Sequence, residues 1–145
     1  MFNVLFVYGL TAGLAASVVW AAATLVVDAA FLPILRHHAG QLHERVLAAP
    51  ALSLFILAIN LAAWGALFGW MYPLVYPVFK PFGSIIGGTI WGLILFVPYS
   101  RGSLETILFT KIPHELNIFR FVEGLVGMAV WGAALGQIFG RLIGQ

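Results

Sequence analysis

The side chains best suited to binding a metal ion in this sequence are its histidines, three of which lie in the stretch RHHAGQLHERV. The four histidines of the chain are His37, His38, His43 and His114. His43 is followed directly by Glu44, and His114 by Glu115. Because mixed imidazole and carboxylate ligands suit iron, zinc or manganese, these two pairs are candidate metal ligands.

The spacing of the histidines decides which kind of metal site they could form. His37, His38 and His43 are one and five residues apart, whereas two ligands on one helical face need a separation of three or four. No second histidine follows His114 at the metalloprotease distance. A site could still assemble between two loops from His43, Glu44, His114 and Glu115. The alternative is that these are hydrated side chains at a membrane surface.

The composition predicts an integral membrane protein. Of 145 residues, 62% are hydrophobic and 8% charged, and the mean hydropathy of +1.03 is far above that of a soluble domain. A net charge of +2 provides no basic patch for nucleic acid, so nucleic acid is excluded as a partner. The absence of cysteine excludes thiolate metal sites and disulfides.

The apolar runs predict an all-α integral membrane four-helix bundle that forms a single transmembrane domain, residues 1–145. A helix needs roughly 20 apolar residues to cross a bilayer. The predicted spans are residues 4–32, 51–72, 82–97 and 118–143, with interfacial loops at 33–50 and 98–117. Pro33 and Pro98 are expected to end the first and third helices, and Asn117 to cap the fourth.

With four crossings, the loops at 33–50 and 98–117 lie on the same side of the membrane. All four histidines are therefore expected on that side. Pro73, Pro77 and Pro81 oppose a continuous helix between the second and third spans. Ser103 is expected to begin a short surface helix. Five basic residues on the histidine side against two on the other place the histidines in the cytoplasm. The layout resembles that of small four-helix proteins of the bacterial inner membrane, which implies that location.

Two short segments suggest an internal duplication. WGALFG, beginning at Trp64, matches WGAALG, beginning at Trp131, with an offset of 67 residues. Gly9 and Gly13 are similarly echoed by residues 83 and 87, with an offset of 74. The chain would then be two transmembrane hairpins related by a pseudo-twofold axis along the membrane normal. Coincidence among common glycine, alanine and tryptophan residues is the alternative.

Small residues four positions apart predict close helix packing at the end opposite the histidines. The packing glycines are Gly9, Gly13, Gly65, Gly69, Gly132, Gly136 and Gly140. Bulky residues at the histidine end predict wider separation and a slot for a lipid-like or quinone-like molecule. They are Phe31, Leu52, Phe55, Ile56, Leu93, Phe96, Phe119 and Phe121. Alternatively, this bulk faces lipid or a partner subunit.

Polar residues inside spanning segments are functional candidates because burying them in a bilayer is costly. Asp28, Arg120 and Glu123 lie at comparable depths near the histidine end, where Arg120 could bridge both carboxylates. The alternative is that each reaches the interface and is hydrated. Asn60 is expected to hydrogen-bond between helices.

These features favour a small non-catalytic membrane subunit that packs with, anchors or stabilises a larger complex, in contact with lipids and with other subunits or copies of itself. A second hypothesis is a redox-associated protein that binds a transition metal, lipid or quinone near the histidine–glutamate pairs. A third, a transporter half assembled around Asp28, Asn60 and Glu123, is disfavoured because prolines are expected only at helix ends. The apolar spans contain no histidine for haem ligation, and the chain has no phosphate-binding glycine loop or nucleophile elbow.

Overall fold

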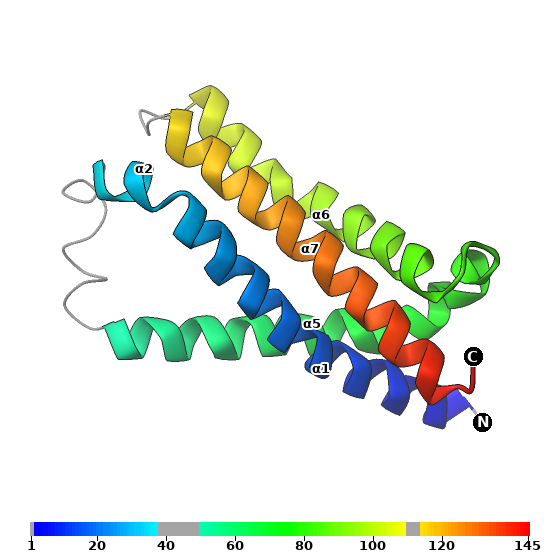
Figure 1. The fold of residues 1–145 in the computed structure, drawn as a ribbon. Helices are drawn as coiled ribbons and strands as arrows, with labels where there is room; N and C mark the ends of the chain where they lie inside the picture. The colour runs from blue at the N-terminus through cyan, green and yellow to red at the C-terminus, as the bar shows by residue number, and fades with distance from the viewer. Residues whose placement is uncertain (1, 38–49, 110–113) are drawn as a thin grey trace.

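The computed structural model describes residues 2–37, 50–109 and 114–145, and every regular element in these ranges is helical. The elements are α1 (Phe2–Ala30), α2 (Leu32–His37), α5 (Pro50–Phe79), the 3₁₀ helix η1 (Lys80–Phe82), α6 (Ser84–Phe109) and α7 (His114–Leu142), as Figure 1 shows. The predicted all-α class is confirmed for these residues. His38, His43 and Glu44 lie outside the described residues.

Three of the helices are long and apolar enough to cross a membrane, judged by length and composition. They are Asn3–Ala30, Phe55–Phe82 and His114–Leu142. The apolar part of α6, Ser84–Pro98, is shorter. These helices fit a membrane protein, while the fourth crossing remains a prediction.

Three prolines that were expected to end or interrupt helices lie inside them. α5 continues through Pro73 and Pro77, and α6 continues through Pro98. The expectation that helices end at these prolines was therefore wrong, while the bounds of the membrane spans stay predictions. A proline removes one helical hydrogen bond and crowds the carbonyl four residues earlier, but membrane helices tolerate this where a neighbour approaches the freed group. Before Pro73 that carbonyl belongs to Gly69, which packs against α1.

Two predicted helix starts were also wrong. α7 begins at His114, so Asn117 lies within the helix and is not its N-cap. Ser103 continues α6 and does not begin a separate helix. Pro33 matches its prediction more closely, because α1 ends at Ala30 and the proline lies in the first turn of α2, where a missing N–H costs little.

The helices form an open arrangement with α1 and α7 in the middle. α5 packs on α1, and α6 packs on α7. α5 and α6 meet near their connecting turn, where the Trp91 indole donates a hydrogen bond to the carbonyl oxygen of Phe68 across 3.4 Å. From the α1 crossing toward its amino-terminal end, α5 diverges from the other helices (Figure 1).

Glycines lie at both close crossings. Where α1 crosses α5, a Cβ atom on Gly69 would lie 2.6 Å from the Cα of Gly13. Where α6 crosses α7, a Cβ atom on Gly136 would lie 2.9 Å from the Cα of Gly88. Distances this short leave no room for a side chain, so the backbones touch directly. The contacts on α6 come from Gly88 and Gly92, whereas Gly83 lies in the turn before α6 with φ +83°.

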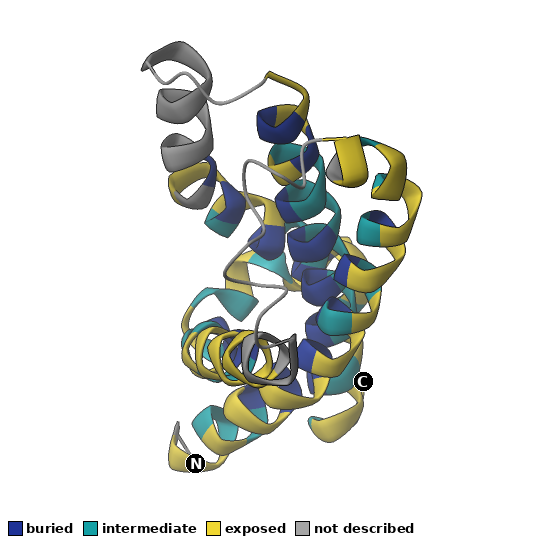
Figure 2. Cartoon of the chain, turned by 90° about the vertical axis from the view of Figure 1, so that its left-hand side faces the viewer, coloured by how far each residue is buried: buried dark blue, intermediate teal, exposed yellow. Residues whose placement is uncertain are grey.

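The core follows α7 along its buried face. The largest fully buried side chains are Trp131, Tyr72, Phe139, Met128, Leu135 and Asn117. Figure 2 shows buried residues along the centre of the molecule, with exposed residues predominating on the described part of α5 that diverges. Of the three helices long enough to span a membrane, α5 therefore has the least protein around it.

The described histidines lie at one end of the molecule. His37 ends α2 and His114 begins α7, and these two helices are in contact. The two termini and η1 lie at the opposite end (Figure 1). This arrangement agrees with the layout expected from the sequence, although its orientation in a membrane stays a prediction.

Candidate binding slot between the helices

A cavity of about 430 Å³ lies where α5 diverges from the other helices. Its lining residues are Trp20 and Thr24 of α1; Leu57, Asn60, Leu61, Trp64 and Phe68 of α5; Leu95 and Pro98 of α6; and Glu123, Gly124 and Met128 of α7. We call this cavity the slot. All four long helices contribute to it, and no two of them could form it alone.

The closed end of the slot is fixed by the contact between α1 and α5. The Ser17 hydroxyl donates to the carbonyl oxygens of Gly13, at 2.9 Å, and of Leu61, at 3.0 Å. One turn further along α1, Trp20 lies over Gly127 of α7, where a Cβ atom would be 2.5 Å from the indole Nε1. The slot therefore begins directly after the tight crossing, and Gly127 gives Trp20 the space to form its wall.

Aromatic rings make up much of the apolar surface. Trp64 and Phe68 are stacked, with ring centroids 5.1 Å apart and planes inclined by 26°. Trp20 packs against the buried Trp131 at 6.0 Å. Trp64 is 46% exposed, whereas Trp20 is 6% exposed, so the slot runs from an open rim on α5 to a buried wall on α1.

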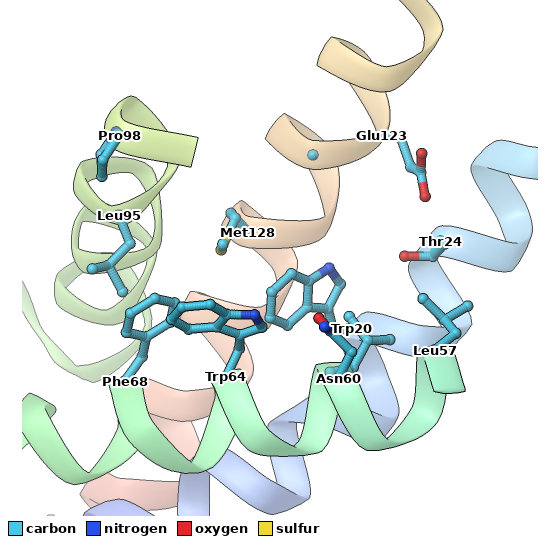
Figure 3. A pocket seen from close by; sticks show the side chains of 12 residues that line it. Trp20, Thr24, Leu57, Asn60, Trp64, Phe68, Leu95, Pro98, Glu123 and Met128 are labelled. Carbon is cyan, nitrogen blue, oxygen red and sulfur yellow. The ribbon is translucent and has the colours of Figure 1, made fainter. Parts of the chain in front are cut away.

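Three polar side chains from three different helices point into the slot (Figure 3). Thr24 of α1 is 4% exposed, and its hydroxyl is directed toward the cavity. The Glu123 carboxyl group descends from α7 toward Thr24, while the Asn60 amide rises from α5. A few convergent polar groups in a mostly apolar cavity are typical of small-molecule sites.

The charges around Glu123 come from the polar residues singled out in the sequence. Asp28 and Arg120 both act electrostatically on the Glu123 carboxyl group. Within the described residues, however, Arg120 forms no ion pair with either carboxylate, so the proposed bridge is not present. Asn60 also lines the slot, and its predicted hydrogen bond to another helix stays a prediction.

The slot lies on the histidine side of the tight crossing, where wider helix separation was predicted, but its lining differs from the residues expected there. None of the eight bulky residues expected there lines this cavity. Phe31 packs on Phe119 at 5.3 Å and Phe96 packs on Phe121 at 5.1 Å, so these rings fill helix interfaces. The opening comes instead from the divergence of α5.

The candidate metal ligands are placed only in part. His114 and Glu115 are exposed at the start of α7. Among the described residues, no three histidine or acidic side chains come together as a metal site would require. A site that includes His43 and Glu44 therefore stays a prediction.

Comparison of this chain with models of protein families, with curated proteins and with solved structures finds no match. The function is therefore argued from the slot itself.

Sequence reasoning missed most of the slot residues. Trp20 and Thr24 are one helical turn apart, and Asp28 follows after another turn, so a polar stripe along α1 was visible. Apart from Asn60, the partners on α5 could not be found in this way, because α5 is almost uniformly apolar and its sequence does not show which face turns inward.

Proposed function

We propose that this protein is a non-enzymatic membrane protein that binds a lipophilic small molecule in the slot. The observation that supports this most directly is the convergence of Thr24, Asn60 and Glu123 on an otherwise apolar cavity of about 430 Å³. Polar groups that need hydrogen-bond partners, set in an apolar surround, match a ligand with an apolar body and a polar head.

The position of the slot indicates a route from the bilayer. Its rim on α5 is exposed at Leu57 and Trp64, by 37% and 46%. Phe55–Phe82 is one of the segments apolar enough to span a membrane, so this rim would face acyl chains. A lipophilic molecule could therefore enter sideways from the membrane without crossing water.

Blocking the slot tests this proposal. Leu57→Trp adds bulk at the rim, and Leu67→Trp adds the same bulk on an outward position of α5 that is 47% exposed. Labelling by a photoreactive fatty-acyl probe in detergent should fall about tenfold in the first variant and stay unchanged in the second. Equal labelling of both variants and the parent protein, mapped by mass spectrometry outside the slot, would contradict the proposal.

A second candidate function, as a subunit of a larger membrane complex, is favoured by one feature of α5. Six consecutive residues, 55–60, are all exposed, so more than one full turn has no packed face. A helix from another subunit or from a second copy would cover this turn.

Since the chain has no cysteine, Ile56→Cys can be crosslinked in native membranes without removing other thiols. Val18→Cys, 72% exposed on α1, is the control.

The crosslinking experiment separates the two candidates. A subunit role predicts a defined adduct from Ile56→Cys and none from Val18→Cys. Adducts that are absent from both variants, or equal in both, would count against a partner on α5 and leave the slot open to lipid.

A further inference from the structure

We infer that the slot selects lipophilic organic cations, held between the Glu123 carboxylate and the faces of the aromatic rings on α1 and α5. This inference rests on the proposed ligand-binding function and adds the charge of the ligand to it. Three features support it: the balance of charge at the slot, the aromatic walls, and the placement of the neutral polar groups.

The formal charges at the slot, two acidic groups against one basic group, sum to a negative value. Glu123 lines the cavity, Asp28 acts on the same carboxyl group, and the opposing charge comes from Arg120. Arg120 is exposed and forms no ion pair with either acid within the described residues. An apolar surround disfavours an isolated carboxylate, and a ligand cation in the slot would stabilise its charged form.

The aromatic walls suit the same ligand. Trp64 and Phe68 form a stacked pair that lines the slot from α5, and the Trp20 indole of α1 lies beside Trp64 (Figure 3). A cation within about 6 Å of a ring centroid is attracted by the negative face of the ring, most strongly for tryptophan. An anion placed there would be repelled by these faces and by Glu123 together.

The neutral polar groups can complete the site without favouring an anion. Thr24 and Asn60 each offer an oxygen that can accept a hydrogen bond from an ammonium group. Both lie on helices facing Glu123, so the head of a ligand would be surrounded on three sides. The remaining lining is apolar and would take the body of the molecule.

Two probes of nearly equal shape and opposite charge test the inference. Displaceable binding of tetraphenylphosphonium and tetraphenylborate is measured on purified protein in a neutral detergent, with empty micelles as background. The cation should bind at least about tenfold more tightly than the anion. Glu123→Gln should weaken cation binding about tenfold, whereas Glu115→Gln, on an exposed residue of the same helix outside the slot, should not.

A second pair of variants tests the inference independently, in case Glu123→Gln does not fold. Trp64→Leu should weaken cation binding about fivefold, while Trp70→Leu, on a residue of α5 that is 45% exposed and outside the slot, should leave it unchanged. Equal affinity for the two probes, or unaltered cation binding in both Glu123→Gln and Trp64→Leu, would overturn the inference.

The outcomes also separate this inference from the proposed function. If tetraphenylborate or neutral triphenylphosphine oxide binds as well as the cation, and Leu57→Trp abolishes that binding, the slot binds lipophiles without charge selection. If neither charged probe nor the neutral one is displaced from the parent protein, both the inference and the proposed function fail.

Discussion

Trp131 donates a hydrogen bond from its indole Nε1 to the carbonyl oxygen of Gly13 across 3.4 Å, which joins α7 to α1. Gly13 lies at the crossing of α1 and α5, because a Cβ atom on this residue would lie 2.8 Å from the Cα of Gly69. One glycine therefore connects three helices at the closed end of the slot. The position of α5 relative to α1 and α7 depends on this contact.

Gly13→Ala should destabilise the protein by about 1–3 kcal/mol, because the new methyl group meets backbone atoms of α5 that cannot move without separating the helices. Thermal unfolding in detergent measures this loss as a lower Tm. Ala15→Val, at an exposed position on the same helix, is the control and should change stability by less than about 0.5 kcal/mol. Similar Tm values for both variants would show that this crossing is not tight in solution.

Ser17→Ala should lower stability by about 0.6 kcal/mol, the average for a hydrogen bond between membrane helices. The variant removes the bond to the Leu61 carbonyl oxygen but leaves the space next to Gly65 unfilled. Thr11→Ala removes a hydroxyl that bonds within α1, to Val7 on an exposed face, and should have little effect. The difference in Tm between these two variants isolates the interhelical bond, and a difference of zero would contradict its role.

The helical class and the polar residues could be predicted from the sequence because they depend on local composition. Long apolar runs predict membrane helices, and an acidic residue inside such a run, such as Glu123, is recognised as a functional candidate. The predictions based on prolines were wrong because the free-energy cost of a proline inside a helix depends on which groups lie beside the freed carbonyl. For Pro73 that neighbourhood is set by Gly9 of α1, and no local pattern reveals it.

A slot was predicted, but its lining could not be, because the lining arises from the relative placement of helices. Gly65 and Gly69 indicated a close crossing, but not that α5 would diverge immediately beyond it. Gly88 was likewise missed as the contact residue of α6, because the suspected repeat pointed to Gly83 and Gly87 instead. The buried face of a uniformly apolar helix can be assigned only when the helices that pack against it are known.

Gly127→Ala should weaken ligand binding in the slot while leaving the stability of the protein nearly unchanged. The new methyl group would meet the indole nitrogen of Trp20, and a side-chain ring can shift where a backbone cannot. We expect a free energy of unfolding within about 1 kcal/mol of that of the parent protein and a clear change in tryptophan fluorescence. Binding of a slot ligand should weaken in parallel. A large fall in Tm without any change in binding would show that Trp20 is not a wall of the slot.

Asn117 is expected to limit stability. It is 1% exposed, and neither its amide nitrogen nor its amide oxygen has a hydrogen-bond partner among the described residues. A buried polar group without a partner costs about 1–3 kcal/mol, so Asn117→Leu, which has a similar volume and no polar atoms, should raise the free energy of unfolding by about 1 kcal/mol or more. Asn117→Asp should lower it, because a charge replaces the amide in the same apolar surround. Unfolding in denaturant compares the two variants with the parent protein, and a loss of stability in Asn117→Leu would mean that this amide has a partner.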